Sequence, residues 1–166
     1  MSPPILLLRD IHLSFGSSPL FEGSDLSVSE RDRLCLVGRN GSGKSTLLKI
    51  ASGIIEPDSG ERFFQPGKTL QYLPQEPKIK NSETVLSYIQ DCLTHVEDFN
   101  QVHSLLEQLK LSGLKKLKTL SGGELRRCAI VKALAPKPDI LLLCLLYTSD
   151  AADDTPCVDL GGRRII

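Results

Sequence analysis

The strongest chemical signal in the chain is a glycine-rich stretch that could surround a phosphate group. Its residues are Gly38, Arg39, Asn40, Gly41, Ser42, Gly43, Lys44, Ser45 and Thr46. Residues 38–45 fit the pattern G-x-x-x-x-G-K-[ST], in which glycines allow a tight turn whose backbone N–H groups point inward. Lys44 can then reach the β- and γ-phosphates, Ser45 offers Mg²⁺ a hard oxygen ligand, and Thr46 can donate to the α-phosphate. The stretch therefore predicts a nucleoside triphosphate site.

The segments on either side of this loop supply the context that such a loop requires. Residues 33–37 form a short apolar run that ends at Gly38, which is typical of a buried parallel strand. Apolar residues at 47, 48, 50 and 51 predict a helix over residues 44–52, which Gly53 would end. This helix would direct the positive end of its dipole at the phosphates. A glycine-rich turn without a phosphate role is the alternative, and these flanks disfavour it.

A second motif, Leu120-Ser121-Gly122-Gly123-Glu124, precedes another predicted helix over residues 121–134. Ser121 and Glu124 have the S-x-x-E spacing of a capping box, which starts a helix. Paired glycines beside a helix start also form a concave surface of N–H groups that can bind an anion. The structural and the functional interpretation are compatible, because a capped, glycine-lined helix start suits a terminal phosphate.

The remaining pattern alternates strands and helices. Strands are predicted over residues 5–15, 25–28, 62–64, 69–73 and 140–143, with a turn at 16–19. Two apolar stripes of helical period lie between residues 82 and 111. This order predicts an α/β protein.

Together the two motifs resemble the ATP-binding cassette (ABC) ATPases, whose signature motif is LSGGQ or LSGGE. The resemblance covers residues 5–143 and implies a P-loop NTPase core with a mostly parallel sheet, an antiparallel N-terminal subdomain and a helical insert over about 78–134. It also implies ATP and Mg²⁺ as ligands. In this family two cassettes sandwich ATP head to tail. Ser121, Gly122, Gly123 and Glu124 would therefore face the nucleotide of a partner cassette.

Two further positions match the family's pattern. Phe15, in Leu13-Ser14-Phe15-Gly16, matches the aromatic residue that stacks on adenine; without the resemblance it would be taken as an ordinary half-buried strand residue. Gln75 matches the Q-loop glutamine, which in the family contacts Mg²⁺ and the attacking water. Outside the resemblance, Gln75 would be taken as a surface residue.

The branch of the family is less sharply indicated. Arg39, Glu124 and the run Leu73-Pro74-Gln75 look like the ABC-F class, whose members carry two cassettes on one chain, lack membrane domains and act on ribosomes. The alternative is the ATPase subunit of a transporter, which docks on a membrane permease. A nucleotide-binding module without turnover is a third hypothesis, because of the residues that follow position 143.

After the strand at 140–143 the family has Asp-Glu-Pro, whose carboxylates order Mg²⁺ and polarise the attacking water. Cys144 and Leu145 occupy these positions, so the sequence predicts no catalytic carboxylate here. The family's switch histidine is also missing, because the His residues are 12, 95 and 103. Residues 144–166 resemble the in-frame translation of a transposase-type sequencing adapter. We therefore expect residues 1–143 to be a partial cassette and 144–166 to be a non-native tail.

Composition excludes several other classes of function. Lys plus Arg and Asp plus Glu both number 20, so the net charge is zero. The chain therefore has no excess of positive charge that would indicate binding to nucleic acid or to an anionic membrane surface. The absence of Trp and the 5% aromatic content disfavour an RNA-stacking sheet. The longest apolar run, residues 140–146, is far shorter than the ~20 residues that cross a bilayer. Five scattered Cys without CxxC spacing favour a reduced, cytoplasmic chain over a zinc site.

Overall fold

The computed structural model describes residues 3–75, 84–90, 92–93 and 97–144, with side chains of 97–100 excepted. These residues fall into two compact units, which divide between Lys68 and Thr69. The first holds the glycine-rich loop, and the second holds the Ser121–Glu124 motif. No helix within the described ranges is long and apolar enough to cross a membrane.

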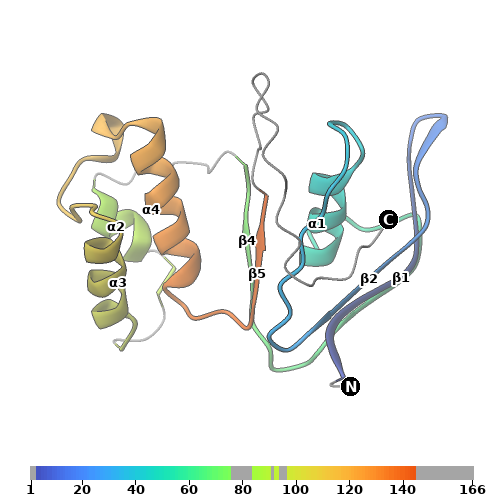
Figure 1. Cartoon of the computed structure of the whole chain (residues 1–166), viewed down its shortest axis with the longest axis horizontal. Coiled ribbons are helices and arrows are strands. Elements are labelled where there is room, and N and C mark those ends of the chain that lie inside the picture. The colour runs from blue at the N-terminus through green and yellow to red at the C-terminus, as the bar shows by residue number, and fades with distance from the viewer. Residues whose placement is uncertain (1–2, 76–83, 91, 94–96, 145–166) are drawn as a thin grey trace, which may run out of the picture. The chain divides into compact units, whose positions relative to one another are not determined.

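The first unit is built on an antiparallel sheet with strand order β2-β1-β3 (Figure 1). Its strands are β1 Pro4–Phe15, β2 Ser18–Ser29 and β3 Ser59–Phe64. The central strand β1 contributes Leu6, Leu8 and Ile11, which are fully buried. The predicted antiparallel N-terminal subdomain is thus confirmed. The turn is tighter than expected, because β2 begins at Ser18 and leaves only Gly16 and Ser17 between the strands.

Helix α1, Lys44–Ser52, follows the loop and has the bounds that its apolar pattern predicts. Leu47, Ile50 and Ala51 are its buried residues, and the helix contacts β1. Gly53 ends it in a left-handed conformation with φ of 78°, which glycine adopts without steric cost. The sequence therefore specified both ends of the helix that follows the loop.

The strand predicted over residues 33–37 is wrong for this structure. Residues 32–39 form neither helix nor strand, and the side chains of Leu34 and Val37 are 38% and 84% exposed. A parallel strand is stabilised by hydrogen bonds to neighbouring strands and by cover on both faces. Neither described sheet includes these residues, so their apolar composition alone does not make a strand.

The second unit contains the predicted helical insert. Its helices are α2 Val85–Gln90, α3 Glu97–Gln108 and α4 Gly122–Leu134, with a short 3₁₀ turn, η1, at Leu117–Thr119. They bury one apolar cluster, to which α2 contributes Val85 and Ile89 and α4 contributes Cys128 and Val131. The two stripes between residues 82 and 111 are thereby confirmed where they lie on α2 and α3, while Val96, at the end of the first stripe, lies outside the described residues.

Two parallel strands complete this unit. β4, Leu70–Leu73, pairs in register with β5, Ile140–Leu143, and the N–H of Cys144 continues the ladder to the Leu73 carbonyl at 3.0 Å. Ile140 and Leu142 are buried as predicted, whereas Leu143 is 40% exposed. Asp139 joins the two strand starts by accepting hydrogen bonds from the N–H and hydroxyl of Thr69, at 2.8 and 2.9 Å.

Candidate phosphate-binding loop and signature helix

The glycine-rich loop is folded around the ammonium group of Lys44. Its Nζ donates to the carbonyl oxygens of Gly38 and Arg39, both at 2.7 Å, and lies 3.5 Å from Ser42 Oγ. Gly41 and Gly43 have φ of 84° and 87°, which side-chain-bearing residues rarely adopt. The loop therefore brings Gly38, Arg39, Ser42 and Lys44 together, and the Lys44 ammonium lies against the backbone carbonyls of the first two.

The start of α1 has no side-chain cap. Its N-cap residue is Gly43, which makes no side-chain hydrogen bond, and the first turn holds no acidic residue. The first four N–H groups of a helix lack partners within the helix, and they carry the positive end of its dipole. Ser45 and Thr46, both half-buried, lie in this first turn. An uncapped helix start of this kind is suited to an anion.

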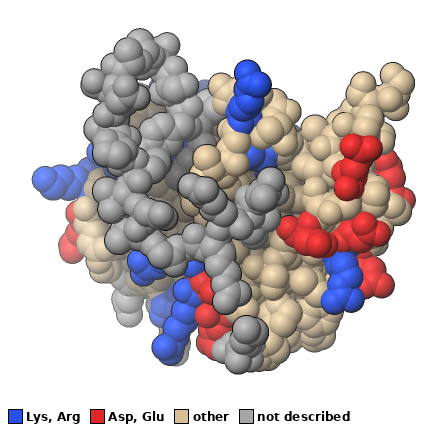
Figure 2. All heavy atoms as spheres, turned by 45° about the vertical axis from the view of Figure 1, so that its right-hand side comes forward, with Lys and Arg blue, Asp and Glu red and all other residues tan. Residues whose placement is uncertain are grey.

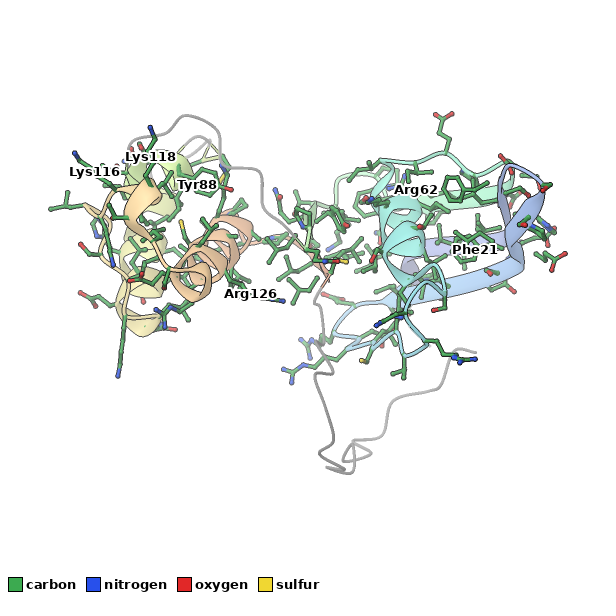
Figure 3. The ribbon with its side chains drawn as sticks, turned by 90° about the horizontal axis from the view of Figure 1, so that it is seen from above. Phe21, Arg62, Tyr88, Lys116, Lys118 and Arg126 are labelled. Carbon is green, nitrogen blue, oxygen red and sulfur yellow. The ribbon has the colours of Figure 1, made fainter. Side chains whose placement is uncertain are left out.

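The aromatic ring of Phe21 packs against Gly43 of this loop, a contact that the sequence analysis did not identify. A Cβ on Gly43 would lie 2.8 Å from Cζ of Phe21 and 3.2 Å from Cγ of Leu20. Phe21 itself is buried on β2, and Figure 3 shows it inside the first unit. Gly43 is therefore required both by its φ and by the aromatic ring packed against it. In the sequence, Phe21 stands out only as part of the apolar pair Leu20-Phe21 in a mostly polar stretch, which indicates burial but not the contact with Gly43.

The other two residues predicted to contact the nucleotide, Phe15 and Gln75, are both exposed. Phe15, at the end of β1, is 62% exposed, so its ring is available to a planar ligand rather than being part of the core. Gln75 is exposed just after β4, in the second unit.

The signature helix α4 begins with the capping box that its sequence predicts. Ser121 Oγ accepts from the N–H of Glu124 at 3.3 Å, and the Glu124 carboxylate accepts from the N–H of Ser121 at 2.9 Å. Gly122 and Gly123 are exposed, and a Cβ at either position would meet nothing within 4 Å. The helix start thus presents an open glycine surface beside a fully formed cap.

Lys115 adds an ionic contact that the sequence analysis did not identify. Its Nζ lies 2.6 Å from Oε1 of Glu124. This hydrogen bond, with those from the backbone and hydroxyl of Ser121, lowers the pKa of Glu124 from about 4.5 to about 2. Hydrogen bonds to a carboxylate favour its charged form, so Glu124 stays ionised well into the acid range.

The lowered pKa predicts a pH-dependent contribution to the stability of α4. A carboxyl group whose pKa is lower in the folded state stabilises that state above its unfolded pKa and loses this contribution as pH falls. For Glu124 the loss is expected between about pH 4.5 and about pH 2. Urea unfolding of the complete gene product should therefore show Glu124→Gln losing less stability than wild type between pH 5 and pH 3. Glu107→Gln, which removes an exposed glutamate from α3, is the control and should follow wild type.

Cys144 lies at the carboxyl end of β5, where the family has its metal-ordering aspartate. Its side chain is buried, and contact with the thiol contributes to raising the pKa of Tyr72 on β4, after burial of the tyrosine itself. A thiol is a soft ligand and not the oxygen donor that Mg²⁺ prefers. Leu145 lies outside the described residues.

Charge is mixed over the face drawn in Figure 2. In this view most Asp and Glu atoms lie to the right, with one basic side chain among them, and the Lys and Arg atoms lie mainly to the left and at the top. The drawn face therefore carries both signs of charge.

The comparison with family models decides the family. The model described as "ABC transporter" matches residues 21–143, a segment that includes both the loop and the signature helix. The chain belongs to this family. Solved structures agree on the fold of the cassette: an ATP-binding subunit of an ABC transporter superposes with a TM-score of 0.76 at 21% identity, covering 84% of this chain and 65% of that one.

Individual relatives of the cassette fall into two kinds. ATP-binding protein Uup of Caulobacter vibrioides is 48% identical over 141 residues, which are 84% of this chain and 22% of that protein. Zinc import ATP-binding protein ZnuC of Brucella melitensis is 37% identical over 128 residues, 75% of this chain and 42% of that protein. The chain thus spans about a fifth of the first relative and less than half of the second.

The donor groups of the cassette fit a magnesium-bound triphosphate. The loop supplies an ammonium group and an uncapped helix start for phosphate oxygens. Among the described residues, no three or more His, Cys, Asp or Glu side chains gather as a metal site. Magnesium is commonly held by few protein groups together with substrate phosphates and water, so a loop that offers a single hydroxyl, that of Ser45, is compatible with such a site.

Proposed function

We propose that residues 38–46 bind the triphosphate of ATP together with Mg²⁺. The observation that carries this proposal is the Lys44 ammonium, held at 2.7 Å from two loop carbonyls beside an uncapped helix start. Lys44 would exchange these carbonyls for β- and γ-phosphate oxygens, which carry full negative charge and bind an ammonium more strongly. Ser45 would hold Mg²⁺, which supplies charge neutralisation between the phosphates. Phe15 would stack on the adenine, and Gln75 would approach the metal and the attacking water.

The signature helix would serve a second nucleotide. Ser121, Gly122, Gly123 and Glu124 would face the γ-phosphate on a partner cassette, either in the same chain or in a dimer. The open surface over the two glycines supports this arrangement, because no described residue of the second unit comes within 4 Å of a Cβ added to either glycine. Hydrolysis in the complete protein would then separate the two cassettes.

We further propose that the complete protein is of the ABC-F class and acts on ribosomes. The supporting observation is relative length. This chain covers 22–28% of three Uup proteins but 42–59% of four ZnuC proteins, so the Uup proteins are about twice as long. Two cassettes on one chain would account for this difference. The 48% identity to one Uup protein exceeds the 28–37% found for ZnuC, whereas the other two Uup proteins, at 29% and 31%, lie within that range.

The competing proposal is the ATP-binding subunit of a transporter that docks on a permease. It is supported by the ZnuC relatives and by a spermidine/putrescine import protein, PotA of Legionella pneumophila, at 32% identity. A nucleotide-binding protein without turnover is the third candidate, since Cys144 stands where a carboxylate is needed.

An experiment on the complete gene distinguishes these proposals. The 3′ end is re-read from an independent library, and the encoded protein is sedimented with ribosomes and with membranes in ATP and in ADP. The ABC-F proposal expects a second cassette and ATP-dependent sedimentation with ribosomes. A single cassette beside a permease gene, with sedimentation on membranes, would support the transporter instead.

We propose that residues 144–166 are a translated adapter rather than part of the cassette. Their resemblance to adapter sequence in one reading frame supports this. The polypeptide 1–166 is accordingly expected to release no phosphate from ATP above background, because neither Cys144 nor Leu145 can replace a carboxylate.

The same polypeptide is expected to aggregate or to bind a hydrophobic dye. Leu34, Val37 and Leu143 are exposed apolar residues on segments that the family buries, and exposed apolar surface promotes association. Light scattering and dye fluorescence measure this. A monodisperse, cooperatively melting polypeptide with Lys44-dependent ATPase activity would contradict both expectations and would make residues 144–166 genuine protein.

A further inference from the structure

Glu124 and Lys115 meet at the start of α4 from different segments of the second unit. Lys115 lies in the loop between α3 and η1, and its Nζ is 2.6 Å from Oε1 of Glu124. The backbone of this loop is fixed on α2, because the N–H of Val85 donates to the Lys115 carbonyl at 3.0 Å. A second such bond, 2.9 Å long, joins Leu86 to Gly113. The ammonium group is therefore presented to Glu124 by an anchored loop.

The carboxylate of Glu124 has opposing effects on this helix start. Its Oε2 completes the cap by accepting from the N–H and the hydroxyl of Ser121, at 2.9 and 3.0 Å. Its negative charge stabilises the helix N-terminus but opposes the approach of another anion. Gly122 and Gly123, where such an anion would approach, are exposed and adjacent in sequence. A nearby positive charge is needed to keep the cap without repelling a phosphate.

We propose that Lys115 is a positioning residue for the signature helix. It neutralises Glu124 and holds the carboxylate in the cap, so that the start of α4 can accept the γ-phosphate of ATP on the partner cassette. This inference rests on the proposed function, in which that helix start faces the partner's nucleotide. Lys115 does not contact the nucleotide; it acts through Glu124.

If Lys115 acts in this way, the effect of replacing it depends on whether residue 124 is charged. Glutamine can also complete a capping box, but it carries no charge. With glutamine at position 124, a cation at 115 has no carboxylate to neutralise. If Lys115 served only to pack the loop on α2, its replacement would have the same effect whichever residue stood at 124. A double-mutant cycle separates these two roles.

The cycle uses the complete gene product and four forms: wild type, Lys115→Met, Glu124→Gln and the double variant. Methionine keeps most of the lysine stem and removes its charge. We expect Lys115→Met to lower kcat of ATP hydrolysis about tenfold when Glu124 is present and less than twofold in the Glu124→Gln background. The Kd for nucleotide at the protein's own loop should stay within twofold in all four forms, because Lys115 acts on the partner's site. Lys115→Arg should retain activity when Glu124 is present.

Lys116→Met is the matched control. Lys116 is the next residue, is exposed, and points away from the second unit in Figure 3, so its replacement removes the same charge without touching Glu124. The kcat of this variant should equal that of wild type. Equal losses from Lys115→Met in both backgrounds, or no loss in either, would overturn the proposal. A wild-type protein whose ATPase activity does not depend on Lys44 would instead refute the proposed function, and this inference would fall with it.

Discussion

Replacement of Lys44 by alanine is expected to lower the affinity for ATP by roughly a hundredfold or more in the complete gene product. The Lys44 ammonium is the positive charge around which the loop is folded, with Nζ donating to the carbonyls of Gly38 and Arg39. In the bound state the same charge would meet the β- and γ-phosphates. Titration with a fluorescent ATP analogue measures the change.

Lys49→Ala is the control for this measurement. Lys49 lies in the last turn of the same helix, so its replacement removes one charge from α1 at the end away from the loop. Its affinity for nucleotide should stay within twofold of wild type, and both variants should melt cooperatively. An affinity of Lys44→Ala within a factor of a few of wild type would contradict the assignment of the phosphate-binding loop.

Replacement of Ser121 by arginine is expected to abolish ATP hydrolysis that depends on two cassettes, while leaving nucleotide affinity at the protein's own loop within twofold. The large side chain would fill the open surface beside Gly122 and Gly123, where the partner's γ-phosphate is proposed to lie. Nucleotide affinity at the loop and steady-state phosphate release are measured on the same preparation. An equal loss of nucleotide affinity would show that the motif acts on its own cassette's nucleotide.

Ser121→Ala separates the loss of the cap from this steric block. Both substitutions remove the hydroxyl that accepts from the N–H of Glu124, and losing such a cap costs about 1 kcal/mol. The two variants should therefore show similar falls in Tm. Only the arginine variant should lose all turnover, and equal residual activity in both would mean that the motif merely caps its helix.

Local features of this cassette were predictable from the sequence because they depend on residues close together in the chain. The capping box joins Ser121 and Glu124 across one helical turn, and the residue types required for it are visible in the sequence. Gly53 ends α1 through its own backbone conformation. The left-handed glycines of the phosphate loop follow from the motif in the same way. Side-chain chemistry and backbone preference at neighbouring positions are sufficient for each.

Contacts between distant segments were not predictable in this way. Glu124 shares the S-x-x-E pattern with Ser121, but its ionic partner Lys115 comes from a loop that is placed by hydrogen bonds to α2. Phe21 lies against Gly43 because β2 packs near the start of α1, and nothing at position 43 specifies which side chain will be there. Such pairs form when the apolar faces of separate elements pack together. Nothing in the sequence distinguished Lys115 from the other lysines of this region.

Residues 33–37 show most clearly the difference between what the sequence predicts and what contacts between distant segments decide. Their apolar composition favours burial, and the sequence alone predicted a strand. A strand also needs neighbours to receive its backbone hydrogen bonds, and no described sheet pairs with these residues, so Val37 is 84% exposed. By contrast, the apolar residues 140–143 form β5, because β4 lies in register beside them. The sequence by itself determined the phosphate loop, the helix caps and the family; tertiary structure decided which apolar segments became strands and which charge stands beside the signature, because both depend on partners from elsewhere in the chain.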